Sequence, residues 1–273
     1  MPSSLLTNLR HCSKGAHGRQ GAFVRRGILG FVSSSVRLER TIVETPEAVL
    51  AALLYTPVET PRRGVVVLSH GYTGCKESMD VPANYLCSRG WACATFDFRG
   101  HKLGGSSGVM NDAADAVADM RAVVEYAKRA CRTDQVVLIG HSLGGAAALA
   151  CAVEEPSVAA VAVLGTSGTV ASGFDTPAGE ALMAQRGDYV EGAPAAVVLQ
   201  GSAELCGRAA GRLHVPTLFV AARGDIIVRP DAVRALADRF RPHSRFVIVD
   251  GSHMELPVRA RGFLTSWLEE LPI

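Results

Sequence analysis

Short apolar runs alternate with longer amphipathic stretches along most of this chain, and this alternation limits its fold more than any other feature. Residues 64–71 (GVVVLSHG) and 135–140 (QVVLIG) are continuous apolar runs, as expected of strands buried on both faces. Between them lies a strong helix pattern at 111–130, with Asn111 or Asp112 as the candidate N-cap. The alternation predicts an α/β protein with a mostly parallel central sheet and helices on both faces.

Further elements are expected on the same grounds. Residues 36–44 and 48–56 flank a TPE turn and are predicted to be two opening strands. The other expected strands are 91–98, 158–166, 216–224 and 245–251, and the other expected helices lie near 77–89, after Ser142, at 229–240 and at 256–270.

Residues 167–213 interrupt the alternation. This segment is too long for an ordinary loop between a strand and a helix, and its helical patches predict two or three short helices. An insertion at this point would lie above the C-terminal edge of the sheet. We therefore expect it to form a lid, with a structureless surface excursion as the alternative.

The charge distribution separates the beginning of the chain from the rest. Six of the 28 Lys and Arg residues lie in residues 1–38, whereas all 26 Asp and Glu residues lie beyond them. A mildly acidic body does not favour nucleic acid as a partner. We expect residues 1–35 to be a basic, disordered tail, with an organelle transit peptide as the alternative, and residues 36–273 to form one domain.

The seven cysteines are scattered and contain no C-x-x-C pair. Such a set favours reduced intracellular thiols over a disulfide framework or a zinc site. No stretch approaches the roughly 18 apolar residues that a membrane-spanning helix needs. The expectation is an intracellular protein, cytoplasmic unless the first 38 residues direct import into an organelle.

The pattern G-x-S-x-G, which marks a nucleophilic serine on a sharp turn, occurs twice. Ser142 follows the predicted strand 135–140 directly and precedes a helix, which is the context that the motif requires. Ser106 follows a glycine-rich loop with no strand before it. Ser142 is therefore the candidate nucleophile, and Ser106 is expected to be a loop residue.

A serine hydroxyl needs a base, and the base needs an acid that orients it. Asp225 ends one predicted strand, and His253 lies in the loop after the next. Asp250 is the rival for the acid, but it lies only three residues from His253 on the same strand end. Asp225 is favoured because it can approach the imidazole from a neighbouring strand.

Attack of a serine on an acyl carbonyl forms an oxyanion, which needs hydrogen-bond donors. The substrate also needs a pocket. The backbone N–H groups of Tyr72, in LSHGYTG, and of Leu143, directly after the candidate nucleophile, are the expected donors. Thr73, Met254 and the lid residue Phe174 are expected to line a pocket for small to medium apolar acyl groups.

Five segments of residues 36–271, in this order, resemble the α/β-hydrolase superfamily: SHGYTG, FDFRGHKLGGSSG, GHSLGG, ARGD and GSHM. The resemblance is closest to small serine esterases of the cinnamoyl or feruloyl esterase kind and of the monoglyceride-lipase kind. It implies that Ser142, Asp225 and His253 form a catalytic triad, with Tyr72 and Leu143 at the oxyanion hole.

One position in these segments departs from the pattern of the family. Lys102 stands where a glycine is common, in a loop that is longer than usual. We expect its ammonium group to be solvated, with contact to an acidic group of the substrate as the alternative.

These features predict a serine hydrolase that cleaves a small-molecule carboxylic ester through an acyl-enzyme on Ser142, without a metal or an organic cofactor. The same site suits a thioesterase, a peptidase or an acyltransferase. Two alternatives of other classes are a receptor-like α/β-hydrolase that only holds a ligand and an interaction protein with an inactive site, since a fold does not fix a function.

Overall fold

The computed structural model describes residues 35–59, 63–170 and 176–273. The predicted tail, residues 1–35, lies outside the described residues except for its last position. Within the described part, no helix is long and apolar enough to cross a membrane.

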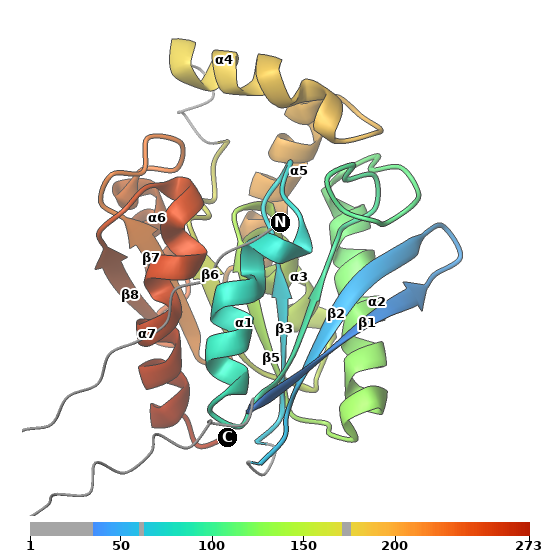
Figure 1. Ribbon diagram of the computed structural model, residues 1–273. Helices are drawn as coiled ribbons and strands as arrows, with labels where there is room; N and C mark the ends of the chain where they lie inside the picture. The colour runs from blue at the N-terminus through green and yellow to red at the C-terminus, as the bar shows by residue number, and fades with distance from the viewer. Residues whose placement is uncertain (1–34, 60–62, 171–175) are drawn as a thin grey trace, which may run out of the picture. The chain divides into compact units, whose positions relative to one another are not determined.

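Eight strands form one sheet in the order β1-β2-β4-β3-β5-β6-β7-β8 (Figure 1). The opening strands run antiparallel, β1 to β2 and β2 to β4, whereas β4, β3 and β5 to β8 are parallel. The mostly parallel sheet expected from the apolar runs is confirmed. The strands are β1 (Val36–Glu44), β2 (Val49–Pro57), β3 (Val65–Ser69), β4 (Ala92–Phe96), β5 (Val136–His141), β6 (Val158–Leu164), β7 (Thr217–Ala222) and β8 (Ser244–Val249).

Helices cover both faces of this sheet. The hydrophobic cluster on one face includes buried residues of α2, α3, α5 and α6, and the cluster on the other face includes those of α1 and α7. The strands between them are apolar on both sides, which explains why β3 and β5 read as unbroken apolar runs. The helices are α1 (Asp80–Cys87), α2 (Ala113–Cys131), α3 (Leu143–Glu154), α4 (Pro177–Arg186), α5 (Ala195–Ala209), α6 (Pro230–Asp238) and α7 (Leu256–Glu270).

Helix α2 begins at a capping box. The Asp112 carboxylate accepts hydrogen bonds from the N–H groups of Ala114 (2.6 Å) and Asp115 (3.3 Å), and the Asp115 side chain accepts a bond from the Asp112 N–H. Of the two candidate caps, Asp112 is therefore the N-cap. The helix ends at Arg132, whose φ of 53° is left-handed.

The described residues of the insertion after β6 form two α-helices and a short 3₁₀ helix, Gly187–Tyr189. Helix α5 buries Val198, Leu205 and Cys206 in the core and contacts α2 and α3. Helix α4, at the top of Figure 1, lies beyond the carboxyl ends of the strands. Of the two helices described in the insertion, α4 therefore occupies the position expected of a lid, whereas α5 belongs to the helical layer below it.

Candidate active site

The turn between β5 and α3 holds Ser142 in a backbone conformation that is rare for a residue with a side chain, with φ 53° and ψ −114°. The Ser142 N–H donates to the Leu164 carbonyl (2.8 Å), and its own carbonyl accepts from the Thr166 hydroxyl (2.8 Å). The neighbouring strand β6 and the loop after it thus hold this turn in place.

Two glycines make the turn possible. A Cβ atom at Gly140 would collide with the backbone of Gly144, and a Cβ atom at Gly144 would lie 2.5 Å from the Ser69 Oγ and 2.7 Å from the His70 carbonyl oxygen. Real Cβ atoms essentially never come this close to another heavy atom. This steric requirement is the reason for the spacing of the two glycines around Ser142.

Asp225 and His253 meet at the adjacent ends of β7 and β8. The His253 Nδ1 lies 2.7 Å from the Asp225 Oδ2. The Asp225 Oδ1 accepts hydrogen bonds from the N–H groups of Ile227 (2.9 Å) and Val228 (2.8 Å), and no part of the carboxylate is exposed. The carboxylate therefore has a fixed orientation. It favours the tautomer of His253 in which Nδ1 carries the proton and Nε2 can accept one.

Asp250, the other acid considered for this role, lies at the surface. Its side chain is 88% exposed, and its Oδ1 accepts from the Arg223 Nε at 2.9 Å. Of the two acids considered from the sequence, the structure brings only Asp225 to the imidazole of His253.

The loop after β3 approaches Ser142 closely. A Cβ atom at Gly71 would lie 3.1 Å from the Ser142 Cβ, which is tighter than most real Cβ contacts, so a side chain there would push against the serine. The next N–H, that of Tyr72, makes no hydrogen bond to another described residue. Leu143 is the first residue of α3, so the helix supplies no acceptor for its N–H. Both expected oxyanion donors thus flank the serine.

His70 holds this loop. Its Nδ1 donates to the Gly71 carbonyl (2.8 Å), and its Nε2 accepts from the Phe98 N–H (3.1 Å). The imidazole is fully buried, and burial lowers its pKa to about 4. His70 is therefore a neutral structural residue.

Ser142 and His253 line one cavity of about 80 Å³ beneath α4. Two predicted pocket residues are there, the buried Thr73 and the half-exposed Met254, whereas Phe174 lies outside the described residues. Sequence reasoning missed further lining residues, which come from helix α4, from the loop near Asp225 and from the first turn of α7: Leu182, Met183, Arg186, Ile227 and Pro257. No motif marks them; only the helical spacing of Leu182, Met183 and Arg186 could have placed these three on one face of α4.

A second, smaller cavity of about 30 Å³ also borders Ser142. Its lining is rich in hydroxyl groups, those of Thr166, Ser167, Thr169 and Ser202. The serine therefore lies between a mainly apolar space and a small polar one.

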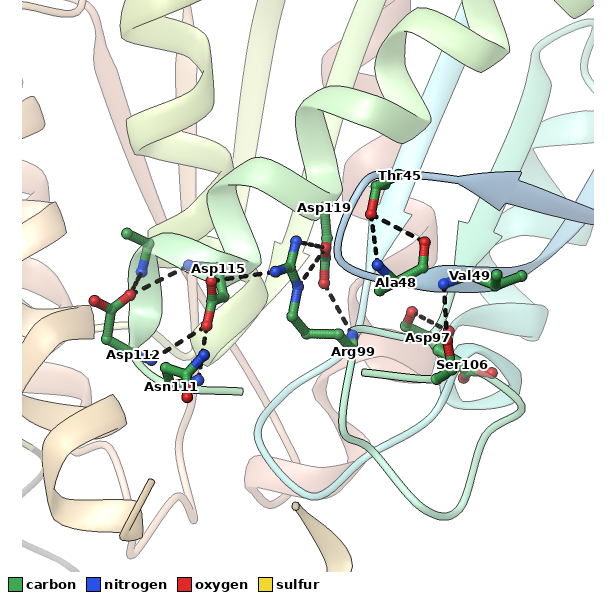
Figure 2. A network of polar contacts seen from close by, with 12 residues as sticks. Thr45, Ala48, Val49, Asp97, Arg99, Ser106, Asn111, Asp112, Asp115 and Asp119 are labelled. Carbon is green, nitrogen blue, oxygen red and sulfur yellow. Dashed lines mark hydrogen bonds and ion pairs between the residues drawn. The ribbon is translucent and has the colours of Figure 1, made fainter. Parts of the chain in front are cut away.

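The second serine motif has a structural role. The Ser106 hydroxyl donates to the Asp97 carbonyl (2.6 Å) and accepts from the Ala51 N–H (2.9 Å), so it ties the loop after β4 to β2 (Figure 2). Ser106 lines neither of the cavities beside Ser142. It is a loop residue, as predicted.

A buried ion pair anchors the start of the same loop to α2, and sequence reasoning missed it. The Arg99 guanidinium donates through Nε (2.8 Å) and Nη2 (2.6 Å) to the Asp119 Oδ1, and the Arg99 N–H donates to Oδ2 (2.9 Å; Figure 2). Arg99 also contacts Asp115 at 3.3 Å. The pair holds the loop that carries Asp97 and Ser106.

Two further histidines are buried near the site. The ring of His141 lies 4.6 Å from that of His253, between centroids, and burial keeps the pKa of His141 well below its usual value. His101 is fully buried against Tyr72 and His70. The backbone of His101 also pairs with that of Val190, which holds the loop at this position.

Lys102 is exposed and does not line the cavity beside Ser142. Its backbone N–H donates to the Tyr189 carbonyl (2.8 Å). Of the two expectations for Lys102, the structure agrees with solvation. Among the described residues, no group of three or more His, Cys, Asp or Glu side chains is arranged to hold a metal ion.

Several known proteins are similar to this chain. Residues 60–192 match a sequence family described as serine aminopeptidase, S33. A monoacylglycerol lipase of Mycolicibacterium smegmatis is 32% identical over 113 residues, which are 41% of this chain and only 40% of that relative.

Two solved structures have similar folds. An esterase of Pyrococcus furiosus has a TM-score of 0.67 at 18% identity and covers 89% of this chain and 95% of its own. A monoacylglycerol lipase of Paleococcus ferrophilus has a TM-score of 0.62 at 20% identity and covers 80% of this chain and 98% of its own. Strand order, the serine turn between β5 and α3, and these likenesses together show that the chain has the α/β-hydrolase fold.

Proposed function

We propose that the protein is a serine esterase, which hydrolyses a small carboxylic ester through an acyl-enzyme on Ser142. One observation carries the proposal: a serine on a strained turn shares a cavity with a histidine whose Nδ1 is 2.7 Å from a buried carboxylate. Strain is retained where the surrounding structure holds it, and such residues cluster at active sites.

The proposed reaction has two halves. His253 takes the proton of the Ser142 hydroxyl on Nε2, and Oγ attacks the ester carbonyl. The oxyanion accepts hydrogen bonds from the N–H groups of Tyr72 and Leu143, each worth about 10²–10³ in rate. Collapse of the intermediate expels the alcohol, which His253 protonates. Water, deprotonated by His253, then attacks the acyl-enzyme and releases the acid.

The lining of the larger cavity supports an ester with an apolar portion. Leu182, Met183 and Ile227 contribute apolar side chains to it, together with Pro257 and Met254. The names of similar proteins, an esterase and two monoacylglycerol lipases, favour the same class of reaction.

An aminopeptidase is the second candidate, because the matched sequence family is described by that activity. Recognition of a free α-amino group needs an anionic partner. No carboxylate of the described residues lines the cavity, and its one permanently charged side chain is the cation Arg186. An amino terminus would be repelled there, so we favour an ester.

The experiment compares bonds of different type at the same site. Wild type and Ser142→Ala are assayed on p-nitrophenyl esters from acetyl to dodecanoyl, on an acyl thioester and on aminoacyl p-nitroanilides. The proposal expects the highest kcat/KM on an ester and loss of turnover in Ser142→Ala. Faster turnover of the thioester or the anilides would replace the esterase by a thioesterase or a peptidase.

A further inference from the structure

The lid helix places a cation in the cavity beside Ser142. Arg186, the last residue of α4, is half-buried and lines this cavity with Leu182 and Met183 of the same helix. The other lining residues are apolar, hydroxyl-bearing or glycine, apart from the two histidines His141 and His253. A permanent positive charge therefore faces a mainly apolar space.

The contacts of Arg186 hold it at the cavity without neutralising it. Its Nη1 lies 3.5 Å from the Thr73 Oγ1, at the limit of a hydrogen bond, and its guanidinium carbon lies 5.6 Å from the centroid of the Tyr189 ring. Thr73 is buried and has a left-handed φ of 62°, in the loop that also supplies Gly71. The guanidinium thus lies against the loop that carries the expected oxyanion donor Tyr72.

No carboxylate of the described residues forms an ion pair with Arg186. By contrast, the other α-helical arginine of the insertion, Arg208 on α5, lies 3.9 Å from Glu204 on the surface. A half-buried cation beside apolar groups loses part of its hydration. An anion with two oxygens would accept two hydrogen bonds from the planar guanidinium and so replace the lost water.

We propose that Arg186 binds an anionic group of the substrate, a carboxylate or a phosphate, and that the preferred esters carry such a group. This inference rests on the proposed esterase function and names its substrate class. The charged group belongs either to the acyl part, as in a monoester of a dicarboxylic acid, or to the alcohol part. From the sequence, contact of Lys102 with an acidic group of the substrate was the alternative to its solvation, but Lys102 lies outside the cavity.

The test uses pairs of esters that differ only in charge. Mono-p-nitrophenyl adipate and p-nitrophenyl hexanoate place the difference on the acyl side. p-Acetoxybenzoate and p-acetoxybenzamide place it on the alcohol side. For each pair, the ratio of kcat/KM for the anionic ester to that for the neutral ester is measured in wild type, Arg186→Met, Arg186→Lys and Arg208→Met.

The proposal expects wild type to favour the anionic ester of one pair. Arg186→Met should lower that ratio about 10- to 100-fold, the range for a hydrogen bond between charged groups. Most of the change should appear in KM, because the contact is remote from the reacting bond. Arg186→Lys should restore part of the ratio, and Arg208→Met, which removes an equal charge from α5, should leave it unchanged. The responding pair identifies the acyl or the alcohol side.

If Arg186→Met leaves the ratio of kcat/KM for the anionic to the neutral ester unchanged in both pairs, the proposal is overturned. If this variant does not fold, wild type carries the test. Equal kcat/KM within both pairs overturns the proposal, and a preference for the anionic ester that weakens as NaCl is raised supports it. Failure of the esterase function itself has a different signature, since wild type would then hydrolyse neither the neutral nor the anionic esters.

Discussion

The Nδ1 atom of His253 lies 2.7 Å from the Oδ2 atom of Asp225, and the other oxygen of this carboxylate accepts two backbone N–H groups. The two residues come from loops after neighbouring parallel strands, which places them at the same edge of the sheet. Both oxygens of the carboxylate are thus engaged, and the imidazole takes its orientation from them.

Asp225→Asn should lower kcat by about four orders of magnitude, because the amide would favour the wrong tautomer of His253. Its oxygen can still accept from the N–H groups of Ile227 and Val228, so its nitrogen would face Nδ1 and force the proton onto Nε2. Steady-state kinetics on a p-nitrophenyl ester measure this. Asp250→Asn is the matched control, and a comparable loss there would contradict the assignment.

Gly144→Ala should destabilise the fold by about 1–3 kcal/mol and abolish turnover, because its Cβ would lie against the Ser69 Oγ and the His70 carbonyl. Gly262, inside α7, is the matched control: beyond its own helix, a Cβ atom there would meet no atom of the described residues within 4 Å, so Gly262→Ala should stabilise by up to about 1 kcal/mol. Urea unfolding measures both. A Gly144→Ala variant with unchanged stability and turnover would show that the turn is looser than described.

Asp119→Asn should lower the free energy of unfolding by about 3 kcal/mol, because it removes the charge that the buried Arg99 guanidinium contacts most closely and leaves only the less buried Asp115 carboxylate at 3.3 Å. Glu154→Gln removes one partner of the exposed pair with Arg121 (2.9 Å) and should cost less than about 1 kcal/mol. Urea unfolding, extrapolated linearly to water, compares the two variants. A small loss in Asp119→Asn would mean that the pair does not anchor the loop.

Acid should destabilise the protein through its buried histidines. Burial lowers the pKa of His101 to about 3 and that of His70 to about 4, whereas an unfolded histidine titrates near 6.5. Unfolding therefore takes up protons below about pH 6.5, and the stability present above it is lost as the pH falls toward 4, by about 1.4 kcal/mol per pH unit for each group. His101→Phe should weaken the dependence of the free energy of unfolding on pH between pH 6.5 and 4 by about 1.4 kcal/mol per pH unit. Urea unfolding over this range measures it. An unchanged slope would contradict the neutral, buried state of His101.

The central strands of the sheet could be predicted because they are buried on both faces and therefore appear as unbroken apolar runs, as β3 and β5 do. Ser142, Asp225 and His253 could be predicted as site residues because each lies just after a strand. Asp225 was already favoured over Asp250 because it follows a neighbouring strand, and the structure adds that Asp225 is buried against His253 whereas Asp250 is exposed.

Other features leave no signal in the sequence. Asp119 looks like a solvated position on an amphipathic helix, and only the path of the loop shows that Arg99 reaches it. Arg186 was missed because the insertion matches no pattern, and charged residues on helices are usually exposed. Lys102 was considered instead because it stood out within a recognisable loop.

The most direct measurement is covalent labelling of the intact protein with a fluorophosphonate, followed by peptide mass spectrometry to locate the modified residue. We expect one labelled serine, Ser142, with labelling lost in Ser142→Ala and retained in Ser106→Ala. Absence of labelling in wild type, or labelling that survives in Ser142→Ala and disappears in Ser106→Ala, would contradict it.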